Sequence, residues 1–242
     1  MNKLFYFLTL TVFACVAFTA DAKKSKSDKT PVTVKVWFKD GRVYEGPMVK
    51  HWNTYAQSFL ASGHNFHTLP DPEAKSVKND ACDTDSILIV SSPDDKWKAG
   101  DLYVSFKGLT PMTGSRKAGG KMLRRTWRGR NVEMCHLPYM GNCMRGLRND
   151  DQRMEYWMVR FPKTGDAVVF YDNPLGKGCH KPLFKSLYFV DRVEKFNPGL
   201  AQAVKDKFIP DKQTGKEMSN AILEKPELFM EFVDNYLTEN PE

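Results

Sequence analysis

The middle of the chain contains a run of basic side chains that could bind an anion. Residues 116–148 contain one acidic residue, Glu133, and these cations: Arg116, Lys117, Lys121, Arg124, Arg125, Arg128, Arg130, Arg145 and Arg148. A guanidinium group binds sulfate, phosphate or carboxylate through two parallel hydrogen bonds, and an indole stacks on a sugar ring or a base. The sequence therefore predicts a site for an anionic glycan, lipopolysaccharide or another polyanion at Arg124, Arg125, Trp127, Arg128 and Arg130.

The same run also fits a solvated strand face whose arginines pair with acids from other parts of the chain. Successive residues of a strand point to opposite faces, so a regular strand would separate Arg124 from Arg125. The prediction of one shared site therefore depends on how the fold turns these side chains.

Soft metal ligands are densest immediately after the arginines, where Cys135, His136, Met140 and Cys143 follow one another closely. Thiolate, imidazole and thioether groups together suit Cu(I) and, to a lesser degree, zinc. Adjacent cysteine and histidine residues rarely share one metal, however, and a loop closed by a disulfide with methionines in the core explains the same residues. No metal or other cofactor is therefore assigned, and a copper or zinc protein is kept as the second alternative.

Enzyme motifs are missing from the sequence. It contains no nucleophile elbow, no phosphate-binding loop, no dinucleotide fingerprint and no His-Glu-x-x-His zinc helix. We therefore expect a non-enzymatic structural or binding module. The alternative is a secreted hydrolase of envelope or dietary glycans or peptides, whose acids are gathered by the fold, and two facing carboxylates with raised pKa values would favour it.

The N-terminus is typical of an export signal. Lys3 precedes the apolar run Leu4–Phe18, which is shorter than the ~20 residues of a membrane span, and Ala20-Asp21-Ala22 is a small-x-small cleavage site. We expect a signal peptide over residues 1–22 and a basic linker over residues 23–30. A bacterial lipid anchor at Cys15 is the alternative reading of this segment.

Composition is that of an ordinary globular protein. Hydrophobic residues make up 41% and charged residues 27% of the 242 residues, and the net charge is +7. The mature chain has no apolar segment of membrane-spanning length, so we expect it in the periplasm, at the outer-membrane surface or outside the cell. Intracellular nucleic acid is accordingly not an expected partner.

Besides Cys15, the chain has an even number of cysteines, which in an oxidising compartment favours two disulfides. The candidates are Cys82, Cys135, Cys143 and Cys179. These cysteines allow three connectivities, and the spacing does not choose among them.

Hydrophobic alternation predicts short antiparallel strands along most of the chain. The clearest pattern is a hairpin at Val32–Phe38 and Arg42–Glu45 around Asp40-Gly41. Further strands are predicted at Asn65–Leu69, Ser86–Ser91, Leu102–Lys107, Lys121–Trp127, Asn131–Leu137, Glu155–Phe161, Ala167–Tyr171 and Leu183–Val190. Helices are predicted from about residue 199, at Gly199–Phe208, Glu217–Leu223 and Pro226–Leu237. The expected class is therefore β-rich α+β, with antiparallel sheets in a sandwich or small barrel and short C-terminal helices.

The turn-rich stretch Ser92–Lys96 suggests a division into a small all-β unit, residues 31–93, and a larger β-rich unit with the helices, residues 94–242. One continuous sheet is the alternative.

Two segments are similar to uncharacterised exported β-rich proteins of Gram-negative anaerobic bacteria. The first is the strand-turn-strand sequence Val34–Gly46, and the second is Tyr156–Pro162 with the following Lys163-Thr164-Gly165. This resemblance implies export and β architecture, and no activity comes with it.

Overall fold

The computed structural model describes residues 31–52, 64–93, 97–106, 120–140, 153–174 and 183–241. The expected signal peptide and linker, the proposed domain boundary at Asp94–Lys96, and the cysteines Cys15, Cys143 and Cys179 lie outside these residues. Pro31–Glu242 form one compact unit, which is described here.

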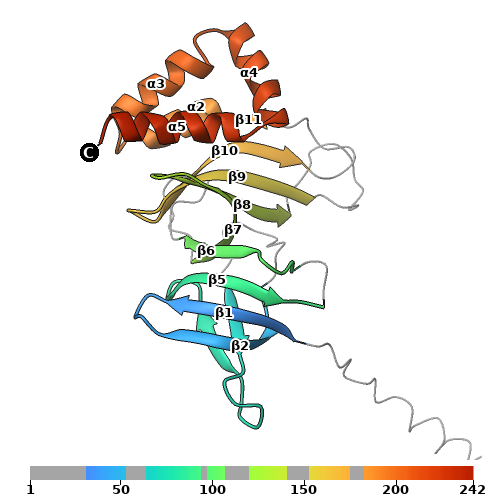
Figure 1. Cartoon of the computed structure of the whole chain (residues 1–242). Coiled ribbons are helices and arrows are strands. Elements are labelled where there is room, and N and C mark those ends of the chain that lie inside the picture. Colours follow the sequence, from blue (N-terminus) through green and yellow to red (C-terminus); the bar gives the residue numbers. More distant parts are fainter. Residues whose placement is uncertain are drawn as a thin grey trace, which may run out of the picture. The chain divides into compact units, whose positions relative to one another are not determined.

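Within these described residues, eleven strands form one antiparallel sheet (Figure 1). Their bounds are β1 Val32–Phe38, β2 Val43–Lys50, β3 Asn65–Thr68, β4 Val77–Asp80, β5 Thr84–Ser91, β6 Leu102–Phe106, β7 Lys121–Arg128, β8 Glu133–Met140, β9 Arg153–Phe161, β10 Asp166–Pro174 and β11 Leu183–Phe184. The order across the sheet is β11-β10-β9-β8-β7-β6-β5-β1-β2-β3-β4. The predicted β-rich α+β class with short C-terminal helices is confirmed, and β5 and β6 pair directly, so the sheet runs through the region of the suggested boundary.

One row of directly paired residues crosses nine neighbouring strands, from β2 to β11. The row is Tyr44, Val36, Ile87, Tyr103, Arg124, His136, Trp157, Tyr171 and Phe184. Directly paired residues lie on the same face of a sheet. The row therefore defines one face throughout, here called the inner face, and the opposite side is called the outer face.

The N-terminal part of the sheet curls around its own core. Only residues 81–83 join β4 to β5, although three strands lie between them in the sheet. The four Cα–Cα steps from Asp80 to Thr84 reach about 14 Å, whereas four strand spacings of a flat sheet amount to about 19 Å. The sheet must therefore bend back on itself, and its inner face encloses a core that includes Val34, Val36, Phe66, Ile87, Ile89 and Trp97.

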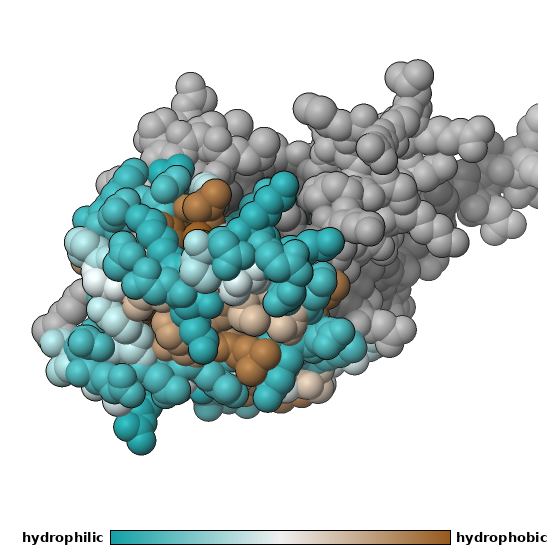
Figure 2. All heavy atoms as spheres, turned by 90° about the horizontal axis from the view of Figure 1, so that it is seen from above, coloured by the Kyte–Doolittle hydropathy of each residue, from teal (hydrophilic) through white to brown (hydrophobic). Residues whose placement is uncertain are grey.

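Four helices cover the inner face at the other end of the sheet, over β8–β10. They are α2 Ser186–Val193, α3 Pro198–Phe208, α4 Lys212–Glu224 and α5 Glu227–Glu239. Phe229 and Val233 of α5 are buried in a core that also contains Val159 and Phe170 from the strands. The side of the helices turned away from the sheet is mostly hydrophilic, with small apolar patches (Figure 2).

The expected strand Leu183–Val190 is wrong beyond Phe184. The chain turns into α2 at Ser186, because Phe189, Val190 and Val193 follow the helical spacing and are buried against the sheet. A short apolar run fits a strand and a buried helix turn equally well until its packing partners are known. The remaining predicted strands and helices are present with shifted ends, and β4 is a strand that the sequence pattern did not indicate.

Candidate anion-binding site

A β-bulge in β7 divides the predicted arginine cluster between the two faces of the sheet. The pairing of β7 with β8 shifts between Arg125 and Trp127. Each residue of β7 after this point therefore lies on the face opposite to the one it would occupy in a regular strand. Arg125 pairs with Cys135 and Arg128 pairs with Glu133, which places both arginines on the outer face. Trp127 and Arg124 are on the inner face.

The structure therefore brings together Arg125 and Arg128 but not the other three predicted residues. Trp127 packs against the core beneath the helices. Arg130 lies in the turn after β7, and its backbone N–H donates to Asp234 of α5 at 3.1 Å. The exposed side chain of Arg130 does not line the pocket described below.

Helix α5 fixes the turn that carries these arginines. The Asp234 carboxylate accepts the backbone N–H groups of Arg130, Asn131 and Val132 at 3.1, 2.6 and 3.2 Å. The same carboxylate lies so close to Gly129 that an added Cβ would meet its atoms at 2.4–2.6 Å. A glycine is therefore required at this point, and the helix holds the β7–β8 hairpin in position.

One buried glutamate collects three guanidinium groups on the outer face. Glu133 Oε2 lies 2.6 Å from Arg160 Nη1, and Glu133 Oε1 lies 2.8 Å from Arg125 Nη1 and 4.0 Å from Arg128 Nε. The side chains of Glu133 and Arg160 are 5% and 10% exposed, whereas that of Arg128 is 68% exposed. Arg160 also donates through Nε to the carbonyl of Ser105 at 3.3 Å. Arg160 is thus held firmly in the interior, and Arg128 extends into solvent.

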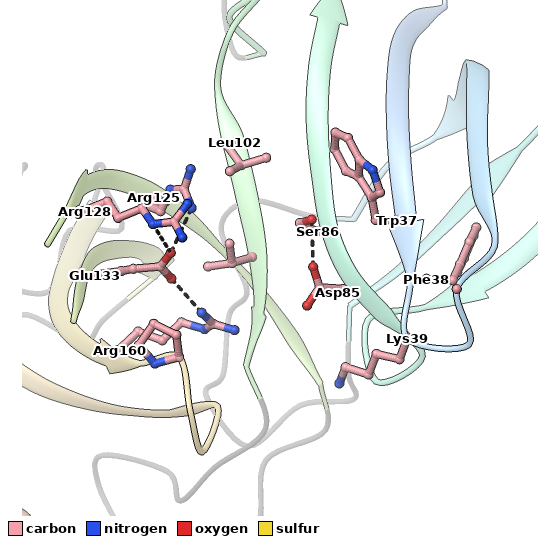
Figure 3. A pocket seen from close by; sticks show the side chains of 13 residues that line it. Trp37, Phe38, Lys39, Asp85, Ser86, Leu102, Arg125, Arg128, Glu133 and Arg160 are labelled. Atoms are coloured by element: carbon pink, nitrogen blue, oxygen red, sulfur yellow. Dashed lines mark hydrogen bonds and ion pairs between the residues drawn. The ribbon is translucent and has the colours of Figure 1, made fainter. Parts of the chain in front are cut away.

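These arginines form one wall of a pocket of about 710 Å³, here called the arginine pocket (Figure 3). Leu102 and Val104 of β6 line the middle of the pocket. The second wall comes from β1 and β5 and the adjoining turn, and includes Trp37, Phe38, Lys39, Asp85 and Ser86. Four cationic and two anionic side chains line the arginine pocket, so that it carries an excess of positive charge.

Sequence reasoning missed Arg160 and the whole second wall. Arg160 interrupts an otherwise apolar stretch, Tyr156–Phe161, and a charge inside a buried strand requires a partner. That pattern could have indicated Arg160. No local spacing relates β1 to β7, because their proximity arises from the order of strands in the sheet.

A second polar group occupies the inner face. Glu155 Oε2 lies 3.2 Å from His136 Nδ1 and 3.0 Å from Trp157 Nε1, and its Oε1 lies 3.6 Å from Arg124 Nη2. Burial by itself would raise the pKa of the Glu155 carboxyl. Hydrogen bonds from His136 and Trp157, together with the Arg124 charge, outweigh burial and lower that pKa.

The suggested soft-metal set is not assembled around one point. Cys135 and His136 are successive strand residues on opposite faces, so one metal ion cannot bind both. Met140 is four residues along β8 from His136, and Cys143 lies outside the described residues. Within the described ranges, no group of three His, Cys, Asp or Glu side chains could hold a metal ion.

Cys82 and Cys135 are free thiols in the structure. Cys82 Sγ accepts the backbone N–H of Gly120 at 3.1 Å. Burial raises the pKa of the Cys135 thiol, and the nearby negative charge of Glu133 raises that pKa further. Because Cys143 and Cys179 lie outside the described residues, the disulfides stay a prediction.

The helices of the described part of the chain are all too short or too polar to cross a bilayer. Comparisons with models of protein families, with curated proteins and with solved structures gave no match to this chain.

Proposed function

We propose that this protein is an exported, non-enzymatic binding module and that its ligand is an anionic glycan held in the arginine pocket. The observation that carries the proposal is the convergence of three guanidinium groups on one carboxylate. Each guanidinium has five N–H donors, and Glu133 can satisfy only some of them. Donors therefore remain for a carboxylate, sulfate or phosphate group of a ligand.

The Glu133 carboxylate orients the arginines without neutralising them. It anchors Arg160 and Arg125 at short distances, while Arg128 lies 4.0 Å away with most of its side chain in solvent. Oriented cations lose little conformational freedom when an anion arrives, so more of the interaction energy appears as affinity. Export is supported by the N-terminal sequence pattern and directs the choice of ligand towards glycans of the envelope or its surroundings.

We expect Arg128→Ser to weaken the binding of an anionic oligosaccharide about tenfold, which corresponds to about 1.4 kcal/mol. The matched control is Arg130→Ser, which removes the same charge two residues away but lies outside the pocket, and it should change the affinity less than about twofold. Calorimetric titration of a heparin oligosaccharide and of a uronate oligosaccharide at two salt concentrations measures both effects. Equal losses in the two variants would mean that only the net charge of +7 attracts the ligand.

A second candidate, a hydrolase of glycans or peptides, is favoured by the pair of His136 and Glu155. The carboxylate faces His136 Nδ1, and His136 Nε2 has no hydrogen-bond partner among the described residues. The Nε2 atom is buried in this structure, so the histidine can act as a general base only when water is admitted to it. The facing carboxylates that would have favoured a glycosidase are not seen in the described part of the chain, where Glu133 and Glu155 lie on opposite faces beside cations.

If the hydrolase is the correct candidate, His136→Gln should lower hydrolysis of envelope glycans or peptides at least about a hundredfold, because it removes the base. His67→Gln, which changes a half-buried histidine on β3, is the control. Product release is measured as new reducing ends or amino groups, with circular dichroism to show that both variants fold. Equal activity of the variant and the wild type, or no turnover by the wild type, would exclude this role.

A further inference from the structure

The two walls of the arginine pocket have different chemistry. The wall from β7 and β9 presents the guanidinium groups of Arg125, Arg128 and Arg160. The wall from β1 and β5 and the adjoining turn presents an indole, a hydroxyl and a carboxylate, from Trp37, Ser86 and Asp85, and the ammonium of Lys39, which donates to the carbonyl of Cys82 at 2.8 Å (Figure 3). A ligand that contacts both walls must therefore be anionic at one end and must offer an apolar face and hydrogen-bond donors at the other.

Trp37 is placed to stack on such a ligand. In β1 the alternating Val34, Val36 and Phe38 are buried in the curled core, so Trp37 points to the outer face and is only half-buried. Its direct partner on β5 is Ser86, which also lines the pocket. Lys35 Nζ lies 5.7 Å from the centre of the Trp37 ring, which helps to hold the ring in place.

Asp85 is the anionic side chain of the second wall, whose cation, Lys39, is hydrogen-bonded to the carbonyl of Cys82 and not to Asp85. The Ser86 hydroxyl lies 3.0 Å from Asp85 Oδ2, and Asp85 makes no ion pair within the described part of the chain. Its exposed carboxylate can accept hydroxyl groups of a ligand. The same carboxylate repels a further negative charge that a ligand places directly against Asp85.

We propose, on the basis of the anion-binding function above, that the ligand is an acidic saccharide with an isolated charge, such as a single uronic acid next to neutral sugars. The acid group binds Arg125 and Arg128, the apolar face of a neighbouring sugar ring stacks on Trp37, and its hydroxyls donate to Asp85. The pocket volume of about 710 Å³ lies within the range of small-molecule sites and suits a short oligosaccharide.

This arrangement discriminates against densely charged linear polyanions. Heparin and single-stranded nucleic acid carry a charge on almost every unit, so a strand that crosses the pocket brings a second anion to Asp85. Like charges in contact cost affinity, and specificity between related ligands often rests on such a repulsive element. The three guanidinium groups alone would not provide this distinction.

The test compares two probes, a xylo-oligosaccharide that carries one glucuronic acid and a heparin oligosaccharide of similar length. Trp37→Leu should weaken binding of the single-uronate probe about tenfold and should change heparin binding less than about twofold. Trp37→Phe, which keeps an aromatic ring, should retain most of the affinity for the single-uronate probe. Asp85→Asn should strengthen heparin binding about threefold and weaken the single-uronate probe by a similar factor.

Asp83→Asn is the matched control for Asp85→Asn, because it removes the same charge from an exposed residue that does not line the arginine pocket. Unfolding midpoints of all variants show that the effects belong to the folded protein. If neither Trp37→Leu nor Asp85→Asn changes the ratio of the two affinities while Arg128→Ser still weakens both, the saccharide inference is wrong and the anion site stands. If Arg128→Ser changes neither, the proposed function itself is wrong.

Discussion

We expect Glu133→Leu to lower the free energy of unfolding by about 3–5 kcal/mol. The substitution removes the carboxylate that lies 2.6 Å from Arg160 Nη1 and leaves that buried guanidinium without its counter-charge. Arg160 is a direct neighbour of Glu133 across β8 and β9, with apolar residues around it, and cannot extend into water as Arg128 does. Urea unfolding followed by tryptophan fluorescence measures the loss.

Two further variants show whether the loss comes from the unpaired charge. Adding Arg160→Leu to Glu133→Leu should recover most of the lost stability, because an apolar pair of similar volume avoids the buried charge altogether. Glu45→Gln is the control, since it breaks an exposed ion pair with Lys35 and should cost less than about 1 kcal/mol. A double variant as unstable as the sum of its two single variants would mean that packing, and not the charge, determines the loss.

The β1–β2 hairpin shows what local pattern predicts well. Val34 and Val36 alternate with polar positions, and Asp40-Gly41 forms the turn. The first strand is present where the alternation places it, and the second begins as predicted but continues beyond Glu45 to Lys50. The pattern also fixes which side chains point outward, so that the orientation of Trp37 follows from the sequence alone. The sequence does not show that Trp37 lies across the pocket from the arginines of β7 and β9, because the order of strands in a sheet is set by pairing between distant segments.

The arginine cluster shows where such reasoning fails. Composition indicates a cationic region correctly, but the choice of residues depends on which face each side chain occupies. A regular strand would place Arg125 on the same face as Trp127. The bulge between them instead places Arg125 on the same face as Arg128, where the two arginines pair with Cys135 and Glu133 of β8. A bulge adds one unpaired residue, and no residue type in Arg124–Arg128 requires it. Two of the five predicted residues therefore line the pocket.

A buried histidine, His64, lies in the curled core of the N-terminal part of the sheet. His64 is 4% exposed, and its Nδ1 accepts the backbone N–H of Met122 at 3.0 Å, so the ring is neutral with its proton on Nε2. The backbone N–H of His64 donates to the carbonyl of Gly120, and the backbone carbonyl of His64 accepts the N–H of Ala81. These two bonds hold the residue in place, so its ring cannot move outward. Burial, and then the charge of the adjacent Lys121, lower the pKa of His64 to about 3.

This shift makes the protein sensitive to mild acid. The unfolded chain takes up a proton at His64 near its usual pKa of 6.5, whereas the folded protein resists protonation until about pH 3. The contribution of neutral His64 to the free energy of unfolding is therefore fully present above pH 6.5, and it is lost as the pH falls from 6.5 towards 3. One unit of pKa corresponds to about 1.4 kcal/mol, so the loss between pH 6.5 and 5 should be about 2 kcal/mol.

His64→Gln separates this effect from all other titrating groups. Its amide oxygen can still accept from Met122, but it does not ionise, so the difference in stability between wild type and variant should shrink steadily from pH 6.5 to pH 5. The acids with lowered pKa values, such as Glu155, begin to lose stability only below their usual pKa of 4.5, and they are common to both proteins. If the wild type and His64→Gln gave parallel curves of unfolding free energy against pH, His64 would take up its proton as readily in the folded protein as in the unfolded chain. The core around His64 would then accept the charge, and the prediction would be wrong.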